Sequence, residues 1–312
     1  MNNVIIRPKS REEWLEHRKN GIGSSEVATI VGLNPWETPY QLWRRKLGLD
    51  PAKDETFAMK AGHYLEDAVA HFWSDATGKQ IIKWSATDWL IKNIEKPYLQ
   101  VSPDRTYWLD DGRGRQNKGI LECKTTQKSI DGDDLPKHWF CQVQYQIGVA
   151  ELEQGSLAWL CSGREFGYKD MELVPDFFGW LVEEVDRFWT DNIIGKQEPS
   201  AQSVQDVLLK YNRHTDGKTV EVDDEVFEAY KDLKGLKEQL SELEERKTVL
   251  EEKIKVAFGD AEAISYGGRT LATWKAPKPG NKFDAKAFQA AHPDLAREFT
   301  VPAQGARRFL LK

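Results

Sequence analysis

Two short motifs combine residue types that suit metal-assisted chemistry: Ser102-Pro103-Asp104, and Glu122-Cys123-Lys124 further along the chain. If residues 119–125 form a strand, Leu121 and Cys123 point into the core while Glu122 and Lys124 share the opposite face. We expect Asp104 to end a neighbouring strand at a proline-bounded turn. Two carboxylates at adjoining strand ends form an oxygen-rich site suited to Mg²⁺ or Mn²⁺, and the backbone carbonyl of Cys123 is a further candidate ligand.

The chemistry that this pairing suits is hydrolysis of a phosphodiester. That reaction needs a hydroxide, in-line geometry, and neutralisation of charge on the phosphate and the leaving oxygen, which a metal ion supplies. The Lys124 ammonium can hold the attacking water or stabilise the developing charge. A Glu-x-Lys strand is by itself most often a solvated face. Its combination with Asp104 favours the metal site.

The surrounding elements predict a mixed α/β domain. Short apolar segments at 98–108, 119–125 and 156–162 are typical of strands, and we expect them in one central sheet. Helices are expected to pack around that sheet. The helical segments are one that begins at residue 11, one that begins at Ser24-Ser25 after the turn 21–23, one from Thr38-Pro39 to Gly48, and the ranges 58–77, 137–150 and 175–194.

The last ninety residues have a different character. Counting by three and four from Val226 to Ala257 meets ten positions, nine of them apolar and one Lys247, which predicts a coiled-coil helix. We expect it either to fold back or to pair between chains. A hairpin is expected at 262–275 with its turn at Gly267-Gly268, then a linker at 277–280 and two short helices near 284–291 and 293–299. The predicted division is a domain at 1–200, a linker at 201–221, a helical arm at 222–260 and a tail at 261–312.

Several blocks of sequence, taken together, resemble one nuclease family. The motifs at Asp104 and Glu122 resemble the PD-(D/E)xK core, a restriction-endonuclease-like fold with a mixed sheet flanked by helices. The wider pattern, over roughly 10–195, resembles the lambda-exonuclease/YqaJ viral recombinase family. The blocks that carry this resemblance are Arg18 with GIGSSEV at 21–27, NPWETPY at 34–40, GHYLE at 62–66 and QVQYQ at 142–146.

This resemblance implies a function. Members of the family are processive 5′→3′ exonucleases on linear double-stranded DNA, which release mononucleotides and leave 3′ single strands for phage-type recombination by annealing. They work beside a single-strand annealing protein and form toroidal homotrimers. The implied cofactor is Mg²⁺, with Mn²⁺ as a substitute. The implied location is the cytosol of a bacterial host, with a phage or prophage origin.

The resemblance also implies roles for individual residues. Asp104 and Glu122 would bind the metal, and Lys124 would be the catalytic lysine. Glu66 would join the metal shell, and Gln142 would position water or the phosphate.

A terminal 5′-phosphate would be held by Arg18, Ser25 and Ser102. Ser24 lies at the same helix start, where backbone N–H groups favour an anion. The arginine that the family places after the Glu-x-Lys strand has no clear equivalent here, and Lys128 is the nearest basic residue.

Trp36 and Tyr40 leave two interpretations open. They belong either to the core or to a helix start, or one of them is a wedge that splits the duplex end by stacking on a base. Four histidines have no ligand-like spacing with cysteines, which disfavours zinc: His17, His63, His71 and His138. Three cysteines without a CxxC pair exclude the iron–sulfur nucleases with this core and indicate a reducing cytosol.

The net charge of −6 does not exclude a DNA partner, because the charges are unevenly distributed. Residues 223–255 contain 11 acidic and 7 basic side chains, whereas residues 101–130 contain six basic and four acidic ones. No apolar run approaches the length of a membrane span, so no membrane partner is expected. Two rivals remain: a site- or structure-specific endonuclease on the same core, and an inactive DNA-binding scaffold.

Overall fold

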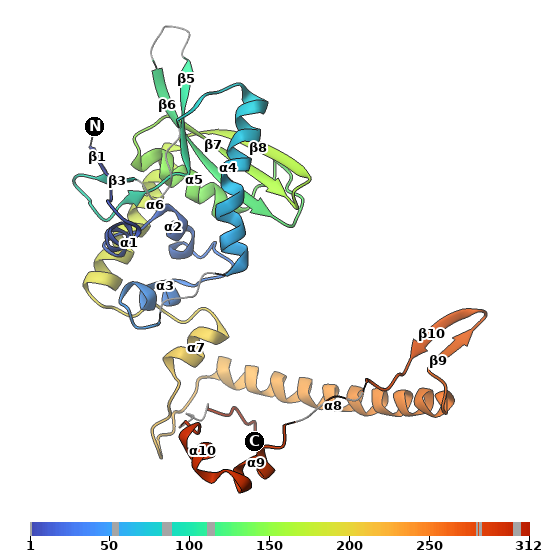
Figure 1. The fold of residues 1–312 in the computed structure, drawn as a ribbon. Helices are drawn as coiled ribbons and strands as arrows, with labels where there is room; N and C mark the ends of the chain where they lie inside the picture. The colour runs from blue at the N-terminus through green and yellow to red at the C-terminus, as the bar shows by residue number, and fades with distance from the viewer. Residues whose placement is uncertain are drawn as a thin grey trace. The chain divides into compact units, whose positions relative to one another are not determined.

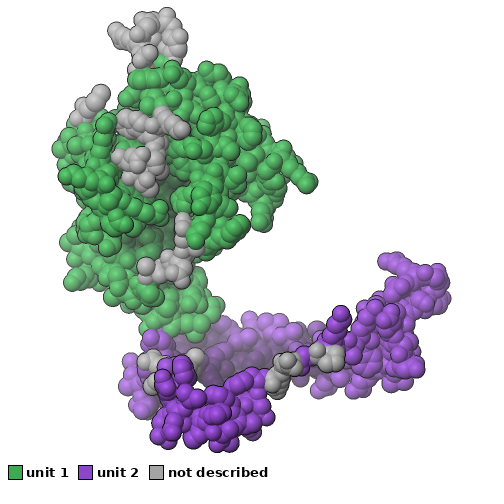
Figure 2. Space-filling model, viewed as in Figure 1, with its two compact units in different colours: residues 1–210 green, residues 211–312 purple. Residues whose placement is uncertain are grey.

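The computed structural model describes residues 2–51, 56–82, 89–110, 116–278, 280, 283–301 and 307–312 (Figure 1). These residues form two compact units, Met1–Lys210 and Tyr211–Lys312 (Figure 2). The finer division into four segments stays a prediction.

A five-stranded mixed sheet forms the centre of the first unit. Its order is β2 (Ile81–Ile82), β5 (Arg105–Asp110), β6 (Gln116–Thr126), β7 (Gln154–Cys161) and β8 (Glu165–Glu172). Strands β6 and β7 are parallel, and the other neighbours are antiparallel. A parallel pair needs a crossover connection, which α5 (Lys137–Val149) provides. The predicted mixed sheet flanked by helices is confirmed.

The two faces of this sheet are covered by different helices (Figure 1) and bury different cores. On one face, Ile120 of β6 packs in a cluster that includes Ile147 of α5. On the other face, Leu121 packs with Val69 and Trp73 of α4 (Phe57–Thr77). Adjacent strand residues therefore lie in opposite cores, as the alternation of side chains requires. Because of the same alternation, Glu122 and Lys124 lie on the α5 side.

The expected single strand at 98–108 is wrong. Strand β4 (Gln100–Val101) belongs to a second, antiparallel sheet with β1 (Asn3–Ile6) and β3 (Leu90–Asn93), whereas β5 belongs to the central sheet. Proline lacks an N–H donor and interrupts a strand ladder, so the chain changes sheets around Pro103. Asp104 consequently precedes β5 rather than ending a strand.

The helices before α4 begin at capping residues that the sequence contains. Ser10 accepts a hydrogen bond from Glu13 N at the start of α1 (Arg11–Lys19), and Thr38 caps α3 (Pro39–Lys46) in the same way. Between them, α2 (Ser24–Ile30) begins after Gly23.

The expected helix at 175–194 consists of two parts. Residues Pro175–Arg187 form the α-helix α6, and Phe188–Ile194 form the π-helix η1. A further helix, α7 (Val204–Lys210), lies within the range that was expected to be a linker.

The second unit contains one long helix, α8 (Asp224–Phe258), followed by a hairpin of β9 (Ala263–Tyr266) and β10 (Arg269–Thr273). Gly267 and Gly268 take positive φ angles of 58° and 77° at the turn, which favours glycine. Two short helices follow, α9 (Ala285–Ala291) and α10 (Pro293–Glu298). The expected hairpin and helices are confirmed; part of the expected linker, Pro279, lies outside the described residues. A helix long and apolar enough to cross a membrane is absent from the described parts of the chain.

Candidate active site

Asp104 lies against the edge of β6 at the point where β5 has not yet begun. Arg105, the first residue of β5, pairs with Leu121, so Cys123 lies just beyond the ladder. The carboxylate of Asp104 completes the edge: its Oδ2 accepts a hydrogen bond from Cys123 N at 2.7 Å. The N–H and C=O of one strand residue face the same edge. The carbonyl of Cys123 therefore faces the side on which Asp104 lies.

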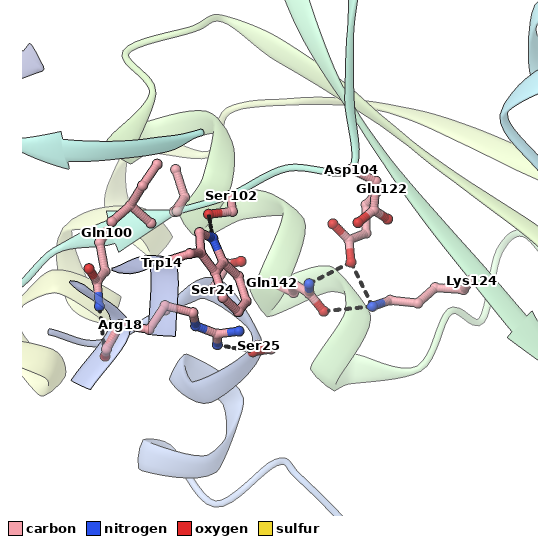
Figure 3. Close-up of a pocket in the computed structure, with 13 residues that line it drawn as sticks. Trp14, Arg18, Ser24, Ser25, Gln100, Ser102, Asp104, Glu122, Lys124 and Gln142 are labelled. Atoms are coloured by element: carbon pink, nitrogen blue, oxygen red, sulfur yellow. Dashed lines mark hydrogen bonds and ion pairs between the residues drawn. The ribbon is translucent and has the colours of Figure 1, made fainter. Parts of the chain in front are cut away.

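Glu122 is buried in a network with α5 (Figure 3). Its side chain is only 4% exposed, and Gln142 Nε2 donates to its Oε1 at 2.5 Å. Gln146 Nε2 donates to the other oxygen, Oε2, at 2.7 Å. The Lys124 ammonium bridges Glu122 Oε1 at 2.7 Å and Gln142 Oε1 at 2.9 Å. Two glutamines one helical turn apart therefore orient the carboxylate and the lysine.

Glu66 approaches from α4 and is paired with an arginine that the sequence analysis did not single out. Arg105 Nη1 binds Glu66 Oε1 at 2.5 Å, and Arg105 Nη2 binds Asp67 Oδ1 at 2.7 Å. The Arg105 and Glu66 side chains are 7% and 18% exposed, so this pairing is largely buried, whereas Asp67 is exposed. Its position in the sequence, directly after Asp104 and at the start of a strand, could have drawn attention to Arg105, because a guanidinium next to a candidate metal ligand needs an acidic partner.

The charges around Asp104 oppose one another. Burial, and then the neighbouring charges of Glu122 and Glu66, raise the pKa of Asp104 well above its usual range. Burial also raises the pKa of Glu66, against the opposing effect of Arg105. For Lys124, burial alone would lower the pKa, but the adjacent Glu122 and Asp104 outweigh it and raise it. The positive charges of Lys124 and Arg105 therefore do not fully neutralise the neighbouring carboxylates of Asp104, Glu122 and Glu66.

This donor set fits a divalent cation. Carboxylate oxygens and a backbone carbonyl are the ligands that Mg²⁺ and Mn²⁺ prefer, and a cation would relieve the repulsion at Asp104. Among the described residues, no three His, Cys, Asp or Glu side chains already converge as a ligand cluster. Glu122 and Glu66 are instead engaged by Lys124, by the glutamines and by Arg105.

One cavity of about 210 Å³ joins this centre to the predicted phosphate-binding residues. Its lining includes both groups (Figure 3): Asp104, Glu122, Lys124 and Gln142 from the first, and Arg18, Ser24, Ser25 and Ser102 from the second. The structure therefore brings together eight of the residues predicted from the sequence.

Arg18 is positioned by neighbours on three sides. Its guanidinium lies 4.8 Å from the ring centre of Trp14, and its Nη2 donates to Ser25 Oγ at 3.0 Å. Gly23 leaves room for it, because a Cβ there would lie 2.9 Å from Arg18 Nη2. Trp14 Nε1 also donates to Ser102 Oγ at 3.3 Å. Trp14 thus links the cationic and the hydroxyl parts of the pocket, a role that the sequence analysis did not foresee.

The remaining predicted residues lie outside this cavity. Lys128 is exposed, and its backbone N–H donates to Thr126 Oγ1 at 3.0 Å. Tyr40 is fully buried and stacks on Trp43, which favours the core interpretation for it. Trp36 is 72% exposed and rests edge-on against His138, with ring centres 5.0 Å apart. Burial, and then the charge of Lys124, lower the pKa of His138.

Comparison with known proteins decides the family. Residues 13–153 match the model of the YqaJ-like viral recombinase domain. The uncharacterized protein YqaJ of Bacillus subtilis (strain 168) is 31% identical over 297 residues, which cover 92% of this chain and 89% of that protein. The chain belongs to the YqaJ family. The resemblance inferred from the motifs is confirmed.

Two solved structures of low identity are also similar to this YqaJ-family chain. One is an alkaline exonuclease (LHK-Exo) from Laribacter hongkongensis, with 16% identity and a TM-score of 0.45, covering 59% of this chain and 93% of that one. The other is a phage-related exonuclease from Haemophilus somnus 129PT, with 12% identity and a TM-score of 0.38, covering 56% of this chain and 96% of that one.

Proposed function

We propose that this YqaJ-family chain is a divalent-metal-dependent exodeoxyribonuclease that digests linear duplex DNA from its 5′ ends. The observation that carries the proposal is the shared cavity, which contains an acid–lysine centre and an arginine–serine pocket. An enzyme that recognises a terminal phosphate and cuts the bond next to it needs a phosphate-binding pocket and a reaction centre in the same cavity. The described phosphate pocket would select the end, and the centre would cut beside it.

Asp104 and Glu122 are the proposed ligands of Mg²⁺ or Mn²⁺, together with the carbonyl of Cys123 and, directly or through water, Glu66. When bound, the ion supplies Lewis-acid chemistry and an activated water to the phosphodiester. Lys124 stabilises negative charge that develops on the phosphate, and its bond to Gln142 orients the ammonium. Glu122 keeps its direction through Gln142 and Gln146, so that its charge remains available at the cavity.

Arg18, Ser25 and Ser102 are the proposed contacts of the terminal 5′-phosphate. Charge-assisted hydrogen bonds from a guanidinium to a phosphate are among the strongest in proteins, and hydroxyls add donors of adjustable direction. Ser24 is tied to the centre, because Gln146 Nε2 donates to its Oγ at 3.1 Å and also binds Glu122. This chain of contacts supports a fixed spacing between the pocket and the reacting bond.

The family description, a viral recombinase domain, supports a place in recombination. Digestion of the 5′-ended strand leaves a 3′ single strand, which is the substrate of an annealing protein. A single-strand annealing protein, a trimeric ring, a phage origin and a cytosolic location remain part of this proposal.

The test is digestion of linear duplex DNA that carries a label at the 5′ end of one strand. Early release of labelled mononucleotide, only with Mg²⁺ or Mn²⁺ present, is the expected result. A closed circular plasmid should stay intact in the same reaction. Cutting of the circle would favour the endonuclease alternative, and the absence of any nucleotide release would favour an inactive DNA-binding protein.

A further inference from the structure

The long helix α8 carries an apolar stripe that is exposed along its length. We name this stripe the arm seam; it consists of Val226, Ala229, Leu233, Leu236, Leu240, Leu243, Lys247, Leu250, Ile254 and Ala257. Leu240, Leu243 and Leu250 are 58%, 56% and 60% exposed. A stripe of this length, at heptad spacing, is characteristic of a helix that pairs with another helix.

The second unit contains no described helix of comparable length to cover the arm seam. Helix α8 has 35 residues, whereas α9 has 7 and α10 has 6. Helix α8 is also continuous from Asp224 to Phe258, so the seam does not fold back on itself. Its partner must therefore bring a helix of roughly 50 Å, at about 1.5 Å per residue.

We propose that the partner is α8 of a second copy of this chain, and that the two helices run antiparallel. In that orientation the two side chains that face each other in a layer of the seam fit together in size. From one end to the middle, the facing residues are Val226 with Ala257, Ala229 with Ile254, Leu233 with Leu250, Leu236 with Lys247, and Leu240 with Leu243. Each alanine faces a β-branched residue, which gives layers of similar volume along the seam.

A parallel arrangement makes poorer layers from the same residues. Each residue would then face its own copy, so Lys247 would lie against a second Lys247 inside the seam. Like charges at that separation repel, and a buried ammonium requires a partner or water. Ala229 would face Ala229, which leaves a gap in the layer. The antiparallel pairing avoids both defects, because Lys247 then packs its stem on Leu236 and can extend its head to solvent.

The charges that flank the arm seam divide into opposite halves. On one flank, Glu225 and Asp232 lie in the first half of α8, and Arg246 and Lys253 lie in the second half. On the other flank, Lys237 lies in the first half and Glu244 and Glu251 lie in the second. Antiparallel pairing places Glu225 and Asp232 against Lys253 and Arg246 of the other copy, and Lys237 against Glu251, so opposite charges meet. Glu244, near the middle of its flank, faces its own copy. Gly235, the weakest helix former in the segment, lies on the outer side of α8, away from the seam.

Measurement of the mass of the full-length protein in solution tests the pairing. We expect the native particle to contain an even number of chains: two, or six if the proposed trimeric ring forms and the arms join two rings. Leu243→Glu should halve that number, because it places a charge in a central layer of the seam. Val249→Glu is the matched control: Val249 is 64% exposed and lies on the same helix, but outside the seam. It should leave the mass unchanged. A native mass that corresponds to one chain or to three chains, or an unchanged mass for Leu243→Glu, would overturn the proposal.

A short cross-linker that joins two thiols tests whether the two α8 helices run antiparallel. The full-length protein is used, with one cysteine substitution in the seam of each chain. We expect an Ala229→Cys chain mixed with a longer, tagged Ile254→Cys chain to give the mixed-size covalent dimer. Ala229→Cys alone should give no dimer above the background of the unsubstituted chain, whose Cys141 and Cys161 are buried. A dimer from Ala229→Cys alone indicates parallel helices, and absence of the mixed-size dimer contradicts the antiparallel layers. Either result rejects the proposal without affecting the proposed nuclease activity.

Discussion

The carboxylate of Asp104 accepts a hydrogen bond from the backbone N–H of Cys123, with 2.7 Å between Oδ2 and N. The bond attaches the loop between two sheets to the strand that carries Glu122 and Lys124. It leaves the other oxygen of Asp104 for other contacts, so one side chain both completes a strand edge and provides charge at the centre. A substitution that keeps this hydrogen bond but removes the charge therefore separates the two roles of Asp104.

Addition of Mg²⁺ should raise the midpoint of thermal unfolding, and the increase should grow as the pH rises. Burial and the charges of Glu122 and Glu66 raise the pKa of Asp104. An acid whose pKa is raised by folding stabilises the folded state when protonated, and this contribution is lost as the pH rises through the raised pKa. Mg²⁺ competes with that proton, so its affinity increases over the same range. The measurement is thermal unfolding with and without Mg²⁺ across a pH series.

Asp104→Asn is the matched variant for this prediction, because its amide oxygen can still accept from Cys123 N but carries no charge. It should lose the Mg²⁺-dependent increase. Cleavage should fall by at least roughly 100-fold, since even groups that only support a metal ligand contribute about 10- to 100-fold. Duplex binding should persist, because phosphate contacts elsewhere supply most of the affinity. Substantial residual cleavage would remove Asp104 from the reaction centre.

Gln146→Met should weaken Mg²⁺ binding and cleavage by about 10- to 100-fold, the usual effect of removing a group that orients a metal ligand. Gln146 is fully buried and donates to Glu122 Oε2 at 2.7 Å. Gln144→Met is the control on the same helix, since Gln144 is equally buried but donates to Glu172 O instead. Titration of Mg²⁺ by calorimetry distinguishes the two variants. Equal losses of affinity would show that Gln146 acts through general stability.

Arg18→Ala should reduce the preference for 5′-phosphorylated over 5′-hydroxyl duplex ends. A hydrogen bond to a charged group contributes about 1.5–3 kcal/mol, so the rate on phosphorylated ends should fall roughly 10- to 150-fold. The rate on 5′-hydroxyl ends should change much less. Lys19→Ala is the control, because the Lys19 side chain is 71% exposed and pairs with Glu16 on the same helix. If the native enzyme digests both kinds of end at one rate, the pocket does not bind a terminal phosphate.

Trp36→Ala should slow digestion of a blunt duplex while leaving a duplex with a frayed end nearly unaffected. The exposed indole of Trp36, which rests against His138, is our candidate for the wedge. Stacking on one base contributes about 1–3 kcal/mol, which corresponds to roughly 5- to 150-fold. Trp36→Phe should retain most of the rate because it keeps an aromatic face. An equal loss on blunt and frayed ends would contradict the wedge.

A chain that ends after Lys210 should retain metal-dependent cleavage of a short 5′-phosphorylated duplex. All the residues that line the cavity belong to the first unit. The acidic excess of the arm would repel a DNA backbone, so the arm is expected to lie away from the reacting strand. Circular dichroism first establishes that the shortened protein is folded. A folded protein that binds Mg²⁺ and DNA yet does not cut would place the second unit in the active site.

Local patterns in the sequence determined where individual helices, strands and turns begin, and which residues share a strand face. A capping residue such as Thr38 predicts where a helix begins, because a side-chain oxygen satisfies a free N–H group of the first turn within three residues. The glycine pair at 267–268 predicts the hairpin for a different local reason, because the tight turn requires positive φ angles that glycine adopts without strain. The alternation of β6 places Glu122 and Lys124 on one face, and together with Asp104 this predicts the chemistry of the centre.

Only the tertiary structure decided which of these groups meet. The pairing of Glu66 with Arg105 joins residues 39 positions apart, and the bond from Gln146 to Glu122 joins residues 24 apart. Such contacts depend on which helix covers which face of the sheet, and no local pattern specifies that. The burial of Tyr40 and the division of 98–108 between two sheets have the same cause. Whether an aromatic or a strand is internal is determined by the elements packed against it, which come from distant parts of the chain.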